Sequence, residues 1–459
     1  MTWKKRAWWS ERGQAKRHIL FAMASTDALF SPRSLGSLPL KNRVIYPAMT
    51  RGRCVGRVVG PENIKYYLMR AGAGMIVTEP SSVSEGANGF MDAPGMYTLE
   101  HARAWSELTK KLHTEGATVV AQLWHTGRMS HSSFHGGAQI VGASALPIVP
   151  DDSSAVPACG VQGADGEWYD HEVPRELTTA EVEAIVEDFG KAAALAVQAG
   201  FDGVEIHAAS GYLIDSFLQS CSNARTDKYG GDVERRFNLL GEIVRRVALE
   251  LPASRVGVKL SPNSGFNGMG SADNHDAFAR YAARLSELGV AYLHVQDGVG
   301  TNGLEAAWFG RVSTDGAHSK CKPVTLAQLR SVFSSGGLIG NGGYTAESAA
   351  AAVARGDAAA ISFGRQYMRN PDLAERLRAG LPLEPLPPKD AWFEPSAKTR
   401  ADPSWGYSEY GSYTAPPTVP TASCSCSLLT DSQASKYSYE TTLPRMSATA
   451  GQTLIQLVK

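Results

Sequence analysis

The chain lacks the cysteine patterns that hold structural metals. Only six of its 459 residues are cysteines, and no two of them have the Cys-x-x-Cys spacing of zinc or iron–sulfur sites. Cys424 and Cys426 lie in a serine-rich stretch without other ligand residues. We therefore expect no metal site and reduced thiols, as is usual for a cytoplasmic protein.

An excess of charge of either sign is also missing. Lysine and arginine number 45, as do aspartate and glutamate, so the formal net charge is +0 at pH 7. This balance gives no electrostatic reason to expect nucleic acid or an anionic membrane surface as a partner. No stretch is long and apolar enough to cross a bilayer. These absences favour a small-molecule partner and leave monomer and homodimer open.

The two ends of the chain differ in composition from its body. Residues 1–27 begin with a basic, tryptophan-containing run, and we expect a disordered extension. An organelle-targeting arm within residues 1–22 is the alternative. Residues 414–459 are rich in Ser, Thr, Pro and Ala and have too little apolar surface to fold alone. The body, residues 28–400, is therefore expected to carry the chemistry.

In this body an amphipathic helix, a glycine and a short β-branched strand recur. Glycine at the end of a helix supplies the left-handed cap that precedes a short connection. Eight such strands favour a single (β/α)8 TIM barrel, of class α/β, over two doubly wound domains. A Gly-, Pro- and Ser-rich segment, residues 131–174, predicts a long loop after the third strand. The expected strands are 44–49, 75–78, 118–123, 203–207, 256–260, 291–295, 338–340 and 359–363.

The fourth expected strand ends in a cluster of polar residues. Val204 and Ile206 suit a buried parallel strand, and polar residues begin at His207. If one helical turn follows the strand, His207 and Ser210 share a face, and Tyr212 approaches from another direction. An imidazole, a hydroxyl and a phenol at one point can polarise a carbonyl and deliver a proton. A core histidine and a packing tyrosine are the alternative interpretation.

Other strand ends carry residues that suit a phosphorylated ligand. In a barrel, the carboxyl ends of the strands line the mouth of the active site. Glycine pairs leave backbone amides open to a phosphate, and a guanidinium adds charge-assisted hydrogen bonds. The candidates are Ala48, Met49 and Thr50 after the first strand, Gln122 on the third, Lys259 on the fifth, Gly342 and Gly343 after the seventh, and Gly364 and Arg365 after the eighth.

Several segments, in unbroken order, carry a resemblance to a known family. They are residues 40–43, 122–128, 203–213, 222–231, and 362–365 followed by 370–373. Over residues 28–383 the chain resembles the old yellow enzyme family, whose members include bacterial N-ethylmaleimide reductases and plant 12-oxophytodienoate reductases. The resemblance is most specific from residue 203 to residue 231.

The resemblance implies an activity and a set of catalytic residues. It implies an FMN cofactor that NADPH or NADH reduces, and hydride transfer from the flavin to the β-carbon of an electrophilic alkene. The alkene would be an α,β-unsaturated carbonyl, a maleimide or a nitro compound. Tyr212 would then protonate the α-carbon. His207 and Ser210 would bind the oxygen of the acceptor and polarise it.

The resemblance also implies which residues bind the flavin. Ala48, Met49 and Thr50 would lie against the ring, and Gln122 would bind its pyrimidine edge. Lys259 would lie at the N1/O2 side, where positive charge stabilises reduced flavin. The phosphate would be held by Gly342, Gly343, Gly364 and Arg365.

Three residues depart from the family pattern. Ser210 stands where the family usually has Asn or His, and offers a single, shorter donor. Lys259 stands where Arg is usual, and lacks its planar fork. Pro47 precedes Ala48, whereas the family more often has Ala before Pro. These changes bear on efficiency and substrate choice more than on fold.

Two other functions stay open at the level of sequence. One is a flavin-free barrel lyase or aldolase that uses the phosphate site for its substrate. The other is a non-catalytic flavoprotein, because Ser210 weakens the anchor pair, the two side chains at 207 and 210 that would bind the acceptor oxygen.

Overall fold

The fold is described from a computed structural model of the whole chain. The described residues are 26–149, 160–298, 322–388, 391–392, 399 and 401–412. The chain divides into two units, Met1–Tyr413 and Thr414–Lys459, and all described residues belong to the first. The extension expected up to residue 27 lies outside the described residues except for its last two, and the tail expected from residue 414 lies outside them entirely.

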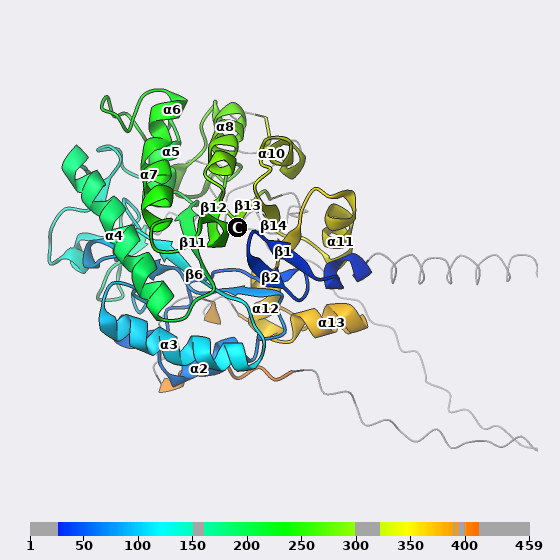
Figure 1. The fold of residues 1–459 in the computed structure, drawn as a ribbon. Helices are drawn as coiled ribbons and strands as arrows, with labels where there is room; N and C mark the ends of the chain where they lie inside the picture. Colours follow the sequence, from blue (N-terminus) through cyan, green and yellow to red (C-terminus); the bar gives the residue numbers. More distant parts are fainter. Residues whose placement is uncertain are drawn as a thin grey trace, which may run out of the picture. The chain divides into compact units, whose positions relative to one another are not determined.

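Within the described residues, eight parallel strands close into a barrel (Figure 1). Closure comes from two pairings, of β15 with β3 and of β6 with β11. The short β5 (Ser81–Ser82) pairs with the carboxyl end of β6, on the edge that β4 occupies earlier along the strand. The predicted single (β/α)8 barrel of class α/β is therefore confirmed. Its strands are β3 (Val44–Tyr46), β4 (Met75–Val77), β6 (Val119–Trp124), β11 (Gly203–Ala208), β12 (Val256–Leu260), β13 (Tyr292–Gln296), β14 (Gly337–Asn341) and β15 (Ala360–Ser362).

Helices follow each barrel strand and form the outer layer (Figure 1). The longest shows why a helix begins where it does: the Thr178 hydroxyl accepts from the Glu181 amide, and the Glu181 carboxylate accepts from the Thr178 amide. The helices are α2 (Pro61–Leu68), α3 (Leu99–Thr114), α4 (Thr179–Gln198), α5 (Leu213–Leu218), α6 (Val233–Arg236), α7 (Asn238–Val247), α8 (Asn274–Glu287), α10 (Leu326–Val332), α11 (Ala346–Arg355), α12 (Gly364–Arg369) and α13 (Leu373–Ala379).

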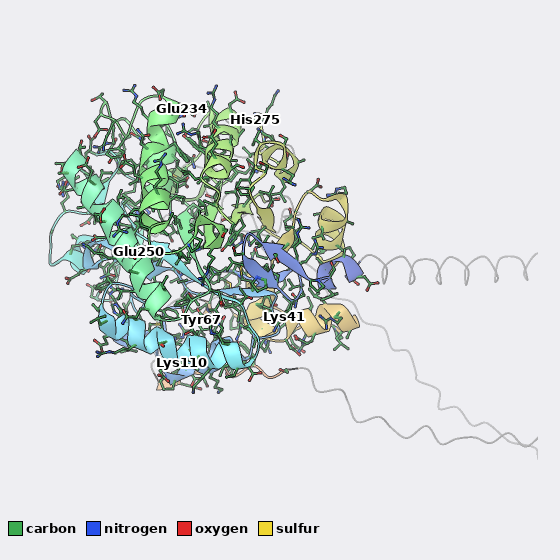
Figure 2. All side chains as sticks on the ribbon, viewed as in Figure 1. Lys41, Tyr67, Lys110, Glu234, Glu250 and His275 are labelled. Atoms are coloured by element: carbon green, nitrogen blue, oxygen red, sulfur yellow. The ribbon has the colours of Figure 1, made fainter. Side chains whose placement is uncertain are left out.

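Figure 2 labels several of the charged residues that the outer helices expose, among them Lys110 and Glu234, together with the buried Tyr67. Lys110 on α3 and Glu234 on α6 have exposed side-chain fractions of 70% and 48%. Tyr67 on α2 is buried, and its hydroxyl accepts a hydrogen bond from the Glu79 backbone amide at 2.8 Å. None of the helices in the described part of the chain is long and apolar enough to cross a membrane.

The first strand is shorter than predicted. It ends at Tyr46 rather than at residue 49. Pro47 has no N–H to continue the ladder, so the chain leaves the sheet there. As a result Ala48, Met49 and Thr50 lie on the loop at the mouth of the barrel.

A hairpin closes the opposite end of the barrel. Strands β1 (Arg33–Leu35) and β2 (Leu38–Leu40) pair antiparallel, and their leucines form one apolar cluster with strand residues. A Cβ at Gly337, the first residue of β14, would lie 2.4 Å from Leu35, so glycine makes room for this leucine. The hairpin thus fills the amino ends of the strands and leaves their carboxyl ends for a site.

The predicted long loop after the third barrel strand is confirmed. It runs from β6 to α4 and contains the short η4 (Ser132–His135), β7 (Val141–Gly142), β8 (Val161–Gln162), β9 (Trp168–Tyr169) and β10 (Arg175–Glu176). Ile148 and Val161 from this loop share an apolar cluster with Trp124 and Tyr212. The loop therefore packs beside the residues at the end of β6 and the start of α5.

Candidate functional site

The carboxyl end of the barrel interior is polar. Val204 and Ile206 of β11 pack outward in the core beneath the helices, so Glu205 and His207 face the interior. Strand register sets Glu205 opposite Gln122, and His207 opposite Lys259. These four interior side chains are all less than a tenth exposed. The barrel mouth therefore carries charged and hydrogen-bonding groups in a desolvated setting.

The structure brings His207 and Tyr212 together. Their ring centroids are 5.0 Å apart at an angle of 89°. Trp124, the last residue of β6, packs edge-on against Tyr212 at 4.8 Å. Burial raises the pKa of the Tyr212 phenol, so it keeps its proton at neutral pH. A protonated phenol thus lies beside an imidazole at the mouth, as the sequence pattern predicts.

His207 is a neutral hydrogen-bonding group. Burial, with a further contribution from the Lys259 charge, lowers its pKa to about 3. Its Nδ1 atom is buried and has no hydrogen-bond partner among the described residues. A neutral imidazole has one N–H to donate and no charge to lose at working pH. It can therefore bind a carbonyl oxygen across a wide pH range.

Ser210 lies in a left-handed turn, not in the helical turn that the sequence suggested. The φ angles of Ser210 and Gly211 are 59° and 75°. The Ser210 amide donates to Ser261 Oγ at 2.6 Å, and Asn267 Nδ2 donates to the Ser210 carbonyl at 2.8 Å. These bonds hold the turn through the backbone of residue 210, without using its side chain.

Buried histidines should make the protein acid-sensitive. Burial lowers the pKa of both His125 and His207 from 6.5 to about 3. Below pH 6.5 the unfolded chain binds protons at these sites that the folded chain does not, so the free energy of unfolding falls as pH falls toward 3. Each histidine contributes up to about 1.4 kcal/mol per pH unit.

Urea denaturation at a series of pH values measures this effect. His125→Gln should give a shallower dependence, because glutamine can accept the same bond from the Gly127 amide and does not titrate. A slope equal to that of the unmodified protein would show that His125 does not contribute.

Two of the proposed flavin-binding residues have groups that suit the cofactor. Gln122 donates through Nε2 to Glu205 Oε1 at 2.6 Å, and its Oε1 is buried without a partner among the described residues. This acceptor complements the imide N–H of a flavin ring. Lys259 is 8% exposed, and within the described residues its ammonium makes no hydrogen bond or ion pair. Both side chains therefore have capacity left for a ligand.

The remaining candidates lie where the loops after three strands meet. A Cβ on Gly364 would lie 3.2 Å from Met49 Sδ, so the end of β15 adjoins the loop that carries Ala48, Met49 and Thr50. Gly342 and Gly343 have φ angles of 121° and 79°, which side chains with a Cβ rarely adopt. Arg365 is the second residue of α12 and is partly buried. The phosphate candidates thus occupy the ends of β14 and β15.

A polar network below these residues was not predicted from the sequence. Glu205 on β11, His294 on β13 and Ser362 on β15 are buried, and His294 bonds to both of the others. A signal was present: Glu205 stands two residues before His207, and His294 interrupts an apolar strand, both at positions that face inward. The bonds themselves join residues far apart in sequence and could not be predicted.

Comparison with known proteins identifies the family. A model of the NADH:flavin oxidoreductase / NADH oxidase family matches residues 28–384. The chain belongs to this family, that of the old yellow enzymes. It is an FMN-dependent oxidoreductase that uses NAD(P)H, so the predicted family, enzyme class and cofactors are confirmed.

Relatives in the old yellow enzyme family match nearly all of the described body. 12-Oxophytodienoate reductase 2 of Arabidopsis thaliana is 34% identical over 386 residues, which are 84% of this chain and 95% of that protein. The old yellow enzyme homologue from Zymomonas mobilis superposes with a TM-score of 0.74 at 34% identity, covering 84% and 99% of the two chains. Morphinone reductase in complex with tetrahydroNAD gives 0.72 at 35% identity, covering 84% and 98%.

Proposed function

We propose that this oxidoreductase is an ene-reductase, which reduces the activated C=C bond of α,β-unsaturated carbonyl, maleimide or nitro compounds. The observation that carries the proposal is the neutral imidazole of His207 beside the protonated phenol of Tyr212 at the barrel mouth. An acceptor of this kind needs one group to bind its oxygen and another to protonate its carbon. The names of two relatives refer to 12-oxophytodienoate and morphinone, which supports a ketone acceptor.

The residues at the mouth fit FMN. The unpartnered Gln122 Oε1 suits the imide edge, and the Lys259 cation suits the N1/O2 side. Gly342, Gly343, Gly364 and Arg365 would hold the phosphate, and Ala48, Met49 and Thr50 would lie against the ring. When bound, FMN takes a hydride from NADPH or NADH and supplies it to the β-carbon of the acceptor.

The protein's own residues would complete the reaction. The His207 N–H and the Ser210 hydroxyl donate to the acceptor oxygen, on which negative charge grows in the transition state. Tyr212 gives its phenolic proton to the α-carbon and regains a proton from solvent. Trp124 and the apolar residues packed around Tyr212 shield most of its side chain and leave the residue 8% exposed.

Anaerobic turnover tests the proposal directly. The purified protein should contain FMN, oxidise NADPH or NADH, and then reduce cyclohexenone, N-ethylmaleimide or a nitroalkene to the saturated product. FMN reduction without oxidation by any of these acceptors would leave a non-catalytic flavoprotein. Absence of FMN would favour the barrel lyase or aldolase.

Arg365→Ala should weaken FMN retention. The variant removes a charge-assisted contact to phosphate, which is worth about 1.5–3 kcal/mol. FMN affinity of the apoprotein, measured by fluorescence titration, reports the change. Arg369→Ala is a matched control, because Arg369 ends the same helix and lies over the Tyr410 ring. Equal FMN affinity in the two variants would place the phosphate elsewhere.

Gly342 is less suited to such a test. A Cβ at this position would lie 2.9 Å from the Gly298 backbone nitrogen, and the φ angle of 121° is strained for other residues. Gly342→Val would therefore disturb the loop even without FMN, and loss of FMN would have two causes.

A further inference from the structure

A chain of hydrogen bonds crosses the barrel interior below the mouth. Gln122 Nε2 donates to Glu205 Oε1 at 2.6 Å, and Glu205 Oε2 lies 2.9 Å from His294 Nδ1. His294 Nε2 lies 2.8 Å from Ser362 Oγ, which accepts from Asn341 Nδ2 at 2.7 Å. The chain links β6, β11, β13, β14 and β15, with the Glu205 carboxylate at its centre.

The chemistry of these groups fixes the direction of each bond. A carboxylate can only accept, so His294 Nδ1 carries a proton and Gln122 turns its NH₂ group toward Glu205. Burial would raise the pKa of Glu205, but the hydrogen bonds from His294 and Gln122 and the charge of Lys259 outweigh it and hold that pKa below its usual range. Burial lowers the pKa of His294, so this ring is neutral and its Nε2 accepts from the Ser362 hydroxyl.

The ionised Glu205 fixes the orientation of the Gln122 side-chain amide. An amide side chain can usually be turned end for end with little cost, because its oxygen and nitrogen are similar in size. Next to an ionised Glu205 only one orientation is allowed. That orientation leaves the Gln122 oxygen as the free, buried atom. Glu205 thereby ensures that the barrel presents an acceptor, not a donor, at this point.

The Glu205 charge also favours the protonated form of Lys259. Burial lowers the pKa of its ammonium, and the Glu205 charge raises it. The other titratable groups nearby are His207 from β11 and His294 from β13; the Lys259 charge helps to lower the pKa of both, and as neutral rings they add no charge of their own. Glu205 is thus the one anion acting on Lys259 among the described residues.

We propose that Glu205 is a positioning residue for the flavin site, which holds the Gln122 amide in a single orientation and keeps Lys259 a cation. The inference rests on the proposed placement of Gln122 and Lys259 against FMN. Glu205 does not touch the cofactor in this arrangement. It acts through two residues that do, one by a hydrogen bond and the other by charge.

Glu205→Gln tests both effects. It frees Gln122 to turn, so FMN affinity of the apoprotein should fall about 3–10-fold, the worth of one hydrogen bond. It also removes the counter-charge of Lys259, so a buried ammonium should lose its proton more easily. Reduction of FMN would then draw a proton to Lys259. The midpoint potential should therefore fall more steeply with pH than in the unmodified protein.

Glu205→Asp separates the two effects. Aspartate keeps the negative charge but is one methylene too short to reach Gln122. FMN affinity should fall as in Glu205→Gln, whereas the pH dependence of the potential should stay as in the unmodified protein. Asp215→Asn is the control for losing a buried carboxylate. Asp215 accepts from the Gly211 amide and from Gln219, and bonds to neither Gln122 nor Lys259.

The role of Glu205 and the proposed ene-reductase function can fail independently in these experiments. Unchanged FMN affinity and unchanged pH dependence in Glu205→Gln would overturn the role of Glu205 while leaving the enzyme an ene-reductase. The same changes in Asp215→Asn would also overturn it. If Glu205→Gln does not fold, Glu205→Asp decides alone, and full FMN affinity in that variant rejects the role. An unmodified protein that reduces no alkene contradicts the proposed function, whatever Glu205 does.

Discussion

Tyr212→Phe should slow the reduction of cyclohexenone by roughly 10²–10⁴-fold, the range expected for a positioned general acid. The substitution removes only the hydroxyl. The ring remains in its edge-on contacts with His207 and Trp124, and its burial is retained. Burial raises the pKa of the Tyr212 phenol, so in the unmodified protein the phenol carries the proton that it donates. The variant has no such proton at any pH.

Stopped-flow kinetics separate the two half-reactions. Reduction of FMN by NADPH or NADH should be unchanged in Tyr212→Phe, since no proton is delivered to carbon in that step. Only reoxidation by the alkene should slow. Tyr229→Phe is a matched control, because Tyr229 is also buried but donates to Glu242 on α7. An enone rate equal to that of the unmodified protein would reject Tyr212 as the proton donor.

His207→Ala should have the second large effect. Removing one donor from an oxyanion site typically costs about 2.7–4 kcal/mol, so most cyclohexenone turnover and most phenol binding should be lost. We expect the neutral imidazole to be the stronger donor to the acceptor oxygen, because the histidine side chain is longer than that of serine. FMN content serves as the control for folding, since His207 is not proposed to hold the cofactor.

The Ser210→Asn substitution tests the other half of the anchor. An amide should raise cyclohexenone turnover and tighten phenol binding, since it reaches further than the hydroxyl. The fold should tolerate it well, because asparagine adopts the left-handed φ of 59° more readily than serine, and the bonds of residue 210 use its backbone. Acceptors that polarise themselves, such as maleimides, should gain less. Lower turnover on every acceptor would mean that the serine is adapted to a specific substrate.

Much of the barrel could be predicted from local patterns. The alternation of helix, glycine and β-branched strand gave all eight barrel strands, because burial of a parallel strand requires a continuous apolar run. Boundaries were less predictable. The first strand ends at Tyr46, because the missing N–H of Pro47 matters more than the apolar character of the residues after it.

The candidate site also has a part that could be predicted from the sequence and a part that could not. His207 and Tyr212 are five residues apart, so a strand end and one turn were enough to predict that they meet. The conformation between them was not predictable. Ser210 and Gly211 are left-handed because distant groups, Ser261 and Asn267, bind the backbone of residue 210.

The sequence by itself determined the fold class, the family and the residues at the strand ends, because each depends on periodicity or on a contiguous motif. Only the tertiary structure decided that Glu205 bonds to Gln122 and His294, which lie 83 and 89 residues away. The register between neighbouring strands sets which inward side chains stand opposite one another. Register follows from closure of the whole barrel, and burial then makes each of these polar contacts obligatory.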